Sequence, residues 1–98
     1  MLKNEYFVFT GTLRTMTRKQ AQYIIMGLKG HNQSNLTKKT TRLITGYFPI
    51  DLIKGYHPSR KLTEAEQAIR SGQSIIIMSE KEFIEFLSQT FQLLSIGL

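Results

Sequence analysis

The chain has 98 residues, of which 41% are hydrophobic and 20% are charged, and this composition excludes intrinsic disorder and fibrous proteins. The absence of cysteine excludes disulfides and thiolate metal sites and favours a reducing compartment. We expect one domain over residues 1–98, because this length can bury a single core.

The first half of the chain predicts three strands and a helix. Residues 6–9 are aromatic and β-branched and end at Thr-Gly, as buried strands do. Thr17 and Gln20 form a capping box ahead of apolar residues at helical spacing, and we expect Gly30 to end that helix. The predicted elements are a strand at 6–9, a helix at 17–29, a short strand at 31–33 and a buried strand at 42–45.

A long loop and a short helix come next. Residues 46–61 contain two glycines and both prolines without a clear period, which predicts a loop of about sixteen residues. The short helix carries Ala65, Ala68 and Ile69 on one face and ends at Ser71 and Gly72.

The last elements are an apolar strand at 75–78 and a helix that begins at the capping box of Ser79 and Glu82. Its buried stripe is Phe83, Phe86 and Leu87, with Phe91 as a further candidate. Residues 91–98 are unusually apolar. They either pack on the domain, which we expect, or expose a patch for another chain.

Charge is distributed unevenly. Residues 1–61 hold eleven Lys and Arg against two acidic residues, a charge of +9, whereas residues 62–98 hold two against five, a charge of −3. An unbalanced basic half favours polyanionic partners such as nucleic acid, although a solvated surface has the same composition. The order of elements predicts an α/β fold with a mainly parallel sheet covered by helices on both faces. Ligands of such sheets gather at the carboxyl ends of the strands.

Several motifs together resemble the bacterial form of the BRCT domain over about residues 5–88, with residues 89–98 as a C-terminal extension. The resemblance is carried by FVFTGTL, MTRKQA, LTKKTTRLITG, SRKLTEAEQAI and SGQSIIIMSEKEFIEFL. It implies a four-stranded parallel sheet of order 2-1-3-4 with one helix on one face and two on the other. Similar modules are attached to exonucleases of the DNA polymerase III epsilon type and to NAD-dependent DNA ligases. This chain departs from the family in having Lys29 before Gly30 and Phe83 in place of a tryptophan.

A phosphate site is predicted where the first strand ends. Thr10 offers a hydroxyl and Gly11 an unobstructed amide ahead of the positive end of a helix. The resemblance implies that Lys61, at the start of the second helix, and Arg18, early in the first, complete the site. The alternative is a strand-ending turn beside two solvated cations.

Three further groups are candidates for contact with DNA: an amide, a basic turn and the aromatic side chains of the long loop. Gln33 lies where some DNA-end binders of the family place a hydroxyl, and its amide can also donate. Lys38, Lys39 and Arg42 form either a charged turn or a contact with the DNA backbone.

The aromatic residues of the long loop, Tyr47, Phe48 and Tyr56, lie in the sequence among Lys54, Arg60 and Lys61. They either stack on unpaired bases or, as we expect, pin the loop to the domain.

The sequence contains no nucleophile elbow, Walker loop or cluster of metal ligands, and His31 and His57 are isolated. We therefore expect a chain that is not an enzyme, with no cofactor and no metal. We also expect it to be soluble, cytoplasmic and associated with the nucleoid, since it has no signal peptide and no apolar stretch of about 20 residues.

The resemblance implies a DNA-binding module that recognises a 5′-phosphorylated DNA end or nick and localises a replication or repair enzyme such as an exonuclease. The alternative is a protein-interaction module, pairing with another BRCT domain or docking a partner of the replication and repair machinery. A structural appendage without a ligand is the third reading.

Overall fold

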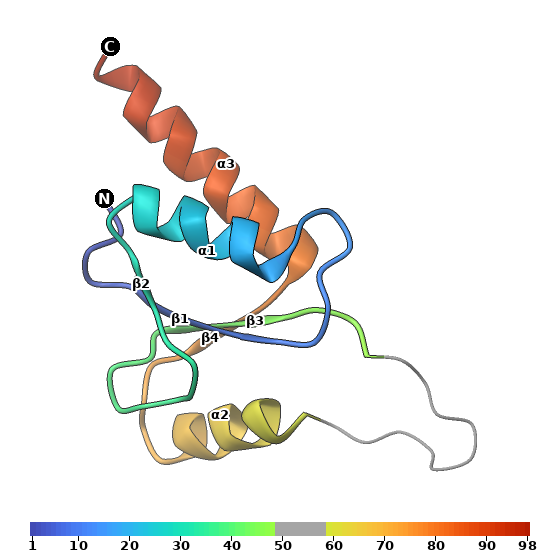
Figure 1. The fold of residues 1–98 in the computed structure, drawn as a ribbon. Helices are drawn as coiled ribbons and strands as arrows, with labels where there is room; N and C mark the ends of the chain where they lie inside the picture. The colour runs from blue at the N-terminus through green and yellow to red at the C-terminus, as the bar shows by residue number, and fades with distance from the viewer. Residues whose placement is uncertain (49–58) are drawn as a thin grey trace.

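Four parallel strands and three helices make up the computed structural model, which describes residues 1–48 and 59–98 (Figure 1). The elements are β1 (Tyr6–Thr10), α1 (Arg18–Gly27), β2 (His31–Asn32), β3 (Arg42–Thr45), α2 (Arg60–Arg70), β4 (Ile76–Ser79) and α3 (Glu80–Ile96). The predicted succession of strands and helices is confirmed. No helix in these two ranges combines the length and the apolar character that crossing a membrane requires.

The sheet has the order β2-β1-β3-β4, and all of its strand pairs are parallel, as predicted. Val8 of β1 lies beside Leu43 of β3, and Leu43 lies beside Ile77 of β4. The two central strands are buried, whereas Ile76 on the edge strand β4 is exposed. The strand order implied by the resemblance already puts this apolar strand at an edge, and the structure confirms it.

The helices lie on both faces of the sheet. α1 and α3 cover one face and α2 covers the other (Figure 1). Phe83 of α3 is fully buried and packs edge-on against Phe7 and Phe9, with ring centroids 6.2 Å and 5.6 Å apart. Val8 points to the opposite face, where it packs in a cluster with Ala65 of α2. The alternation of side chains along β1 therefore divides the core into two layers.

Both predicted capping boxes are present, at Thr17 with Gln20 and at Ser79 with Glu82. The predicted end of the first helix is wrong in detail. α1 ends at Gly27, and Lys29, not Gly30, takes the left-handed conformation, with φ of 69°.

Gly30 is needed for a different reason. A Cβ atom at this position would lie 2.7 Å from Cγ2 of Ile25 and 3.2 Å from Cβ of Leu2. The chain passes so close to the buried end of α1 that a side chain does not fit.

The second helix starts earlier than predicted. α2 begins at Arg60, so Arg60 and Lys61 belong to its first turn and not to the predicted loop at 46–61. Residues 49–58 of that loop lie outside the described residues. Ala65 is buried as predicted, but Ile69 is exposed and does not belong to the buried face.

The apolar tail continues α3 without a break as far as Ile96, and this end of the helix projects beyond the rest of the domain (Figure 1). Phe91 is 50% exposed and Leu98 is fully exposed. The expectation that the tail packs on the domain, with Phe91 in the buried stripe, is therefore wrong. The helix axis carries these residues past the sheet that they were expected to cover.

Glu80, the first residue of α3, holds the segment between β1 and α1. Its carboxylate accepts hydrogen bonds from the amides of Arg14 and Thr15, at 2.7 Å and 2.8 Å, and from the Thr15 hydroxyl. The Thr15 hydroxyl is the main cause that lowers the pKa of the Glu80 carboxyl, and the amides and the Arg14 charge add to it.

We expect Glu80→Gln to destabilise the fold at neutral pH by about 1 kcal/mol, a hydrogen-bond contribution reduced by solvent exposure. A carboxyl whose pKa is lowered by folding stabilises the fold above its usual pKa of 4.5, and the effect disappears as pH falls through the lowered value. Urea denaturation at neutral and acidic pH measures this. The difference between wild type and Glu80→Gln should shrink in acid, while Glu85→Gln on the same helix should show little effect at either pH.

Candidate phosphate-binding site

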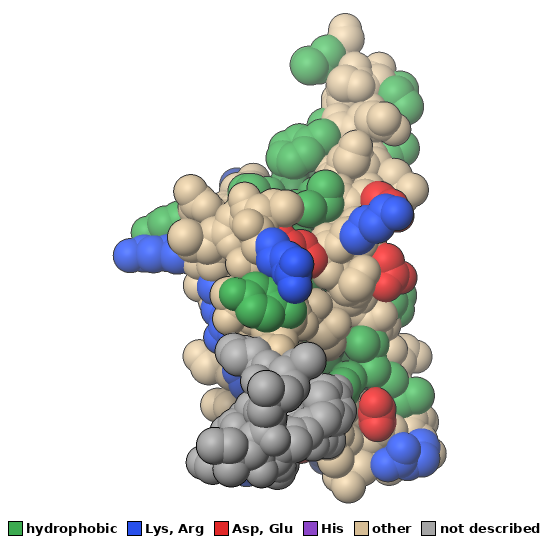
Figure 2. All heavy atoms as spheres, turned by 90° about the vertical axis from the view of Figure 1, so that its right-hand side faces the viewer, with side chains coloured by type: hydrophobic (Ala, Val, Ile, Leu, Met, Phe, Trp, Pro, Cys, Tyr) green, Lys and Arg blue, Asp and Glu red, His purple; other side chains and the backbone are tan. Residues whose placement is uncertain are grey.

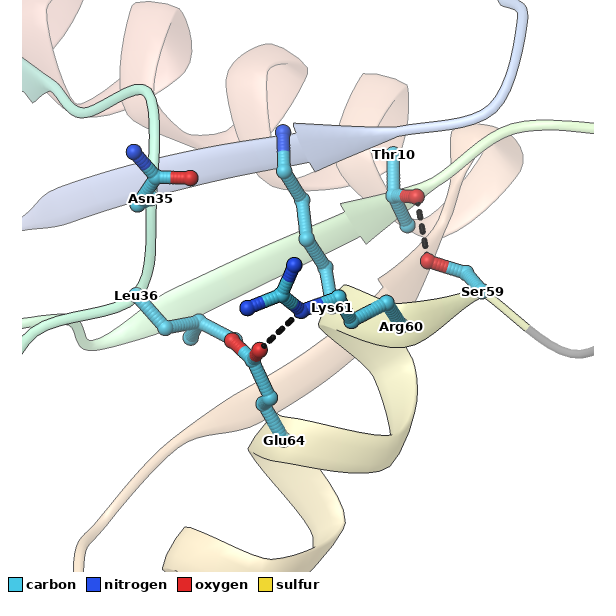
Figure 3. A pocket seen from close by; sticks show the side chains of 7 residues that line it. All are labelled: Thr10, Asn35, Leu36, Ser59, Arg60, Lys61 and Glu64. Atoms are coloured by element: carbon cyan, nitrogen blue, oxygen red, sulfur yellow. Dashed lines mark hydrogen bonds and ion pairs between the residues drawn. The ribbon is translucent and has the colours of Figure 1, made fainter.

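A pocket of about 550 Å³ lies at the carboxyl end of β1, beside the start of α2. The residues that line it are Thr10, Asn35, Leu36, Ser59, Arg60, Lys61 and Glu64 (Figure 3). Three segments far apart in sequence meet here because parallel strands end at the same edge and α2 begins next to that edge.

Two hydroxyl groups sit side by side in the pocket. Oγ1 of Thr10 lies 2.6 Å from Oγ of Ser59, close enough for one to donate to the other. Ser59 is also the N-cap of α2, and its hydroxyl oxygen accepts the amide of Leu62. Whichever hydroxyl donates within the pair, the other keeps its proton for a further acceptor. The pair can therefore donate one hydrogen bond to a ligand.

Lys61 extends from the first turn of α2 toward the end of β1 (Figure 3). Its ammonium donates to the carbonyl of Phe9 at 3.1 Å, which places the charge at the strand end. Burial is the main cause that lowers the pKa of Lys61, the nearby Arg18 guanidinium lowers it further, and Glu64 acts in the opposite direction. An anion bound here would relieve the repulsion between the two cations.

Arg18 and Gly11 lie next to this pocket. The Arg18 guanidinium donates to the carbonyl of Gly11 at 2.8 Å, and both residues line an adjoining pocket of about 370 Å³. Gly11 has φ of 79°, and a Cβ atom there would lie 3.0 Å from the backbone of Gly46 and Tyr47. Its lack of a side chain thus allows the chain after β1 to pass close to the chain after β3.

The four residues of the predicted site are therefore neighbours, but they divide between two adjoining pockets. Thr10 and Lys61 line one, and Gly11 and Arg18 line the other. The Arg18 charge lowers the pKa of Lys61, so the two cations repel each other.

Gln33 is not brought into this group. Its side-chain amide donates to the Thr37 hydroxyl at 3.0 Å, and its carbonyl accepts from the Thr40 hydroxyl at 2.6 Å. The amide thus closes the turn that precedes β3. Gln33 also lines a separate pocket between α1 and β2.

The predicted basic turn lies at the other end of the sheet. Lys39 places its ammonium 6.0 Å from the ring centroid of Tyr6, the first residue of β1, and Lys38 is exposed beside it. Arg42 is occupied within the protein, since it pairs with Glu5 at 2.8 Å and lies over the ring of Phe86. Lys38 and Lys39 are thus exposed at this end of the sheet, whereas Arg42 stabilises the fold.

The start of the long loop is pinned to the domain. Tyr47 exchanges two backbone hydrogen bonds with Thr12, and its ring lies under the guanidinium of Arg14. Phe48 is partly buried. The predicted contributions of Lys54 and Tyr56 fall outside the described residues, as does His57, for which no role is expected.

Sequence reasoning missed Ser59 and Asn35. Ser59 directly precedes a run of helix-forming residues, which is the signal of an N-cap, but it was assigned to the loop. The first turn of α2 contains no acidic residue, so its positive end is not neutralised locally. Hydroxyls, an ammonium and a helix start together suit a phosphate group. Within residues 1–48 and 59–98 there is no group of three side chains able to hold a metal ion.

Comparison with known proteins gives DNA ligases as relatives, whereas no family model matches the chain. A DNA ligase of Carboxydothermus hydrogenoformans is 36% identical over 77 residues, which cover 79% of this chain and 10% of the ligase. The chain resembles a segment of DNA ligase. DNA ligases of Fervidobacterium nodosum and Syntrophus aciditrophicus are 32% and 35% identical over 83 residues, which cover 85% of this chain and 10% of each ligase.

The similarity to DNA ligase covers most of this chain but only about a tenth of the length of these relatives. It supports the ligase part of the predicted resemblance, and it gives no support to an association with exonucleases. The sheet order and the three helices are consistent with the BRCT fold.

Proposed function

We propose that this chain is a non-catalytic BRCT module that binds DNA at a 5′-phosphorylated end or nick and localises a replication or repair enzyme there. The pocket at the carboxyl end of β1 carries the proposal, because Lys61, Thr10 and Ser59 converge in it and Arg18 stands beside it. The similarity to a short segment of DNA ligases supports a DNA-associated role without a catalytic one. Such a module would act in the cytoplasm, at the nucleoid.

A terminal phosphate fits this pocket better than a phosphate within a strand. A terminal group carries nearly two negative charges at neutral pH and three oxygens that accept hydrogen bonds. Lys61 and Arg18 supply two positive charges, and the hydroxyl pair supplies a neutral donor. Lys38 and Lys39 lie at the other end of the sheet. They would add contacts with the DNA backbone that do not require a 5′-phosphorylated DNA end.

Binding of matched duplexes with and without a 5′-phosphate, at two salt concentrations, tests the proposal. We expect the phosphorylated duplex to bind about tenfold or more tightly, since charge-assisted hydrogen bonds contribute roughly 1.5 to 3 kcal/mol each. The salt slope should be modest, at about −0.9 for each phosphate neutralised. Equal affinity of the two duplexes at both salt concentrations would contradict recognition of the phosphate.

A second function, docking of a protein partner, is favoured by one observation. The projecting end of α3 exposes several large apolar side chains, among them Phe91 and Ile96. This surface is separate from the pocket at the end of β1, so the two functions can be tested independently.

A further inference from the structure

The projecting end of α3 is apolar and uncharged. The sequence from Phe86 to Leu98 contains no charged residue. Ile96 is 79% exposed, and hydrophobic side chains gather along this end of the helix (Figure 2). Exposed apolar patches of this kind mark surfaces that are covered by another chain, because water solvates them poorly.

One stripe along this helix alternates large and small side chains. Ile84, Ser88, Phe91 and Ser95 follow each other at spacings of four, three and four residues, which is the spacing of a helix-pairing seam. A groove of about 510 Å³ runs along the stripe. It is lined by Ile84, Leu87, Ser88, Phe91, Gln92 and Ser95.

The groove continues toward the amino end of α3. A second pocket of about 480 Å³ adjoins it, and Ile84 lines both. The other residues of this second pocket are Arg14, Thr15, Glu80, Lys81 and Glu85. The surface open to a partner is therefore elongated along the helix, with notches at the serines and a ridge at Phe91.

We propose that this groove binds the same groove of a second copy of the chain, in an antiparallel helix pair related by a twofold axis. With the axis between Ser88 and Phe91, each Phe91 faces the partner's Ser88 and each Ile84 faces the partner's Ser95. Every large side chain then meets a small one, which is the condition for interdigitated packing. Leu98 of each copy extends over the partner's pocket beside Ile84.

Three features favour a second copy as the occupant. The stripe is self-complementary, since one helix carries both the large side chains and the notches that receive them. The facing segments from Phe86 onward hold no charge and so do not repel each other, and antiparallel alignment opposes the two helix dipoles. Twofold symmetry also uses the groove twice, once on each copy, so both copies cover their exposed apolar side chains in one contact. We expect a weak, reversible dimer, because this surface is a single helix stripe.

Sedimentation equilibrium over a range of concentrations tests the pairing. Wild type should associate reversibly to a dimer, and Phe91→Glu should weaken the association at least about tenfold. Ser88→Leu should weaken it as well, because leucine fills the notch, whereas unspecific apolar association would become stronger with the added leucine. Tyr23→Glu, which removes an equally exposed aromatic side chain from α1, should leave the association unchanged.

Single-cysteine variants test the direction of the helices, since the chain has no cysteine of its own. With a short thiol crosslinker, Ser88→Cys should give a crosslinked dimer, and Leu98→Cys should not. A chain that stays monomeric at high concentration, a Ser88→Leu variant that associates more tightly, or efficient crosslinking of Leu98→Cys would overturn the proposal. None of these measurements uses DNA, so the outcome is independent of the phosphate site.

Discussion

Replacing Lys61 with methionine is expected to weaken binding of a 5′-phosphorylated duplex by about tenfold to a hundredfold, the loss of one charge-assisted hydrogen bond in a partly desolvated pocket. Methionine keeps an unbranched side chain on the first turn of α2 and removes the ammonium that lies at the end of β1. Fluorescence anisotropy with phosphorylated and unphosphorylated duplexes measures the effect. Binding of the unphosphorylated duplex should change much less.

Lys38→Met is the matched control, because it removes the same charge from an exposed turn that precedes β3. It should weaken both duplexes to a similar small extent and lower the salt slope by about one unit at most. Equal losses from Lys61→Met and Lys38→Met would mean that the pocket acts as general positive surface. Thermal unfolding of both variants checks that the fold is intact.

The largest effect on stability is expected for Gly46→Ala, at about 3 kcal/mol. A Cβ atom at this position would lie 2.4 Å from the carbonyl oxygen of Thr12 and 2.6 Å from its carbon. These are backbone atoms, and Thr12 is held by two hydrogen bonds to Tyr47, so the clash cannot be relieved by rotating a side chain. The close passage of the chain beyond β1 and β3 would have to open.

Gly27→Ala provides the contrast within the same chain. Gly27 ends α1, and a Cβ atom there would have no neighbour within 4 Å. Alanine should therefore stabilise the protein by up to about 1 kcal/mol through its higher helix propensity. Urea denaturation of both variants gives the two free energies of unfolding. A Gly46→Ala variant as stable as wild type would show that the strand ends are not held as closely as described.

Local sequence patterns predicted most of the helices and strands, because these elements are stabilised by interactions between residues close in sequence. The capping boxes at Thr17 and Ser79 involve residues three positions apart, and both are present. The sheet order came from the resemblance, since strand patterns alone do not determine which strands are neighbours. Lys29 was missed because the conformation of a single residue at a helix end depends on how the following strand is packed.

Contacts between residues far apart in the sequence could not be predicted from local sequence patterns. Glu80 lies at a helix start, where a carboxylate is favoured, but its bonds to Arg14 and Thr15 span 66 and 65 residues. Arg42 was a candidate for DNA contact until its pairing with Glu5 was seen. The apolar tail predicted burial because hydrophobicity alone does not say where a helix leaves the sheet that it covers.

The candidate site was predicted in part, because some of its residues are marked by local patterns and by the resemblance while others are not. Thr10 and Lys61 were placed at one edge by the strand end and by the family resemblance, and they do line one pocket. Ser59 was missed because it lacks a capping-box partner, since Leu62 stands where a glutamate or glutamine would reveal the cap.

If the pocket binds an anion as proposed, Ser59 ties its occupancy to the order of α2, because one oxygen caps the helix and borders the pocket. The group that closes the first turn of α2 also borders the pocket, so an anion seated there and a well-formed helix start reinforce each other. Fraying of that turn would release the hydroxyl, swing Lys61 away and empty the pocket in a single event. Affinity in such an arrangement is governed as much by the opening equilibrium of one helical turn as by the strength of the individual contacts.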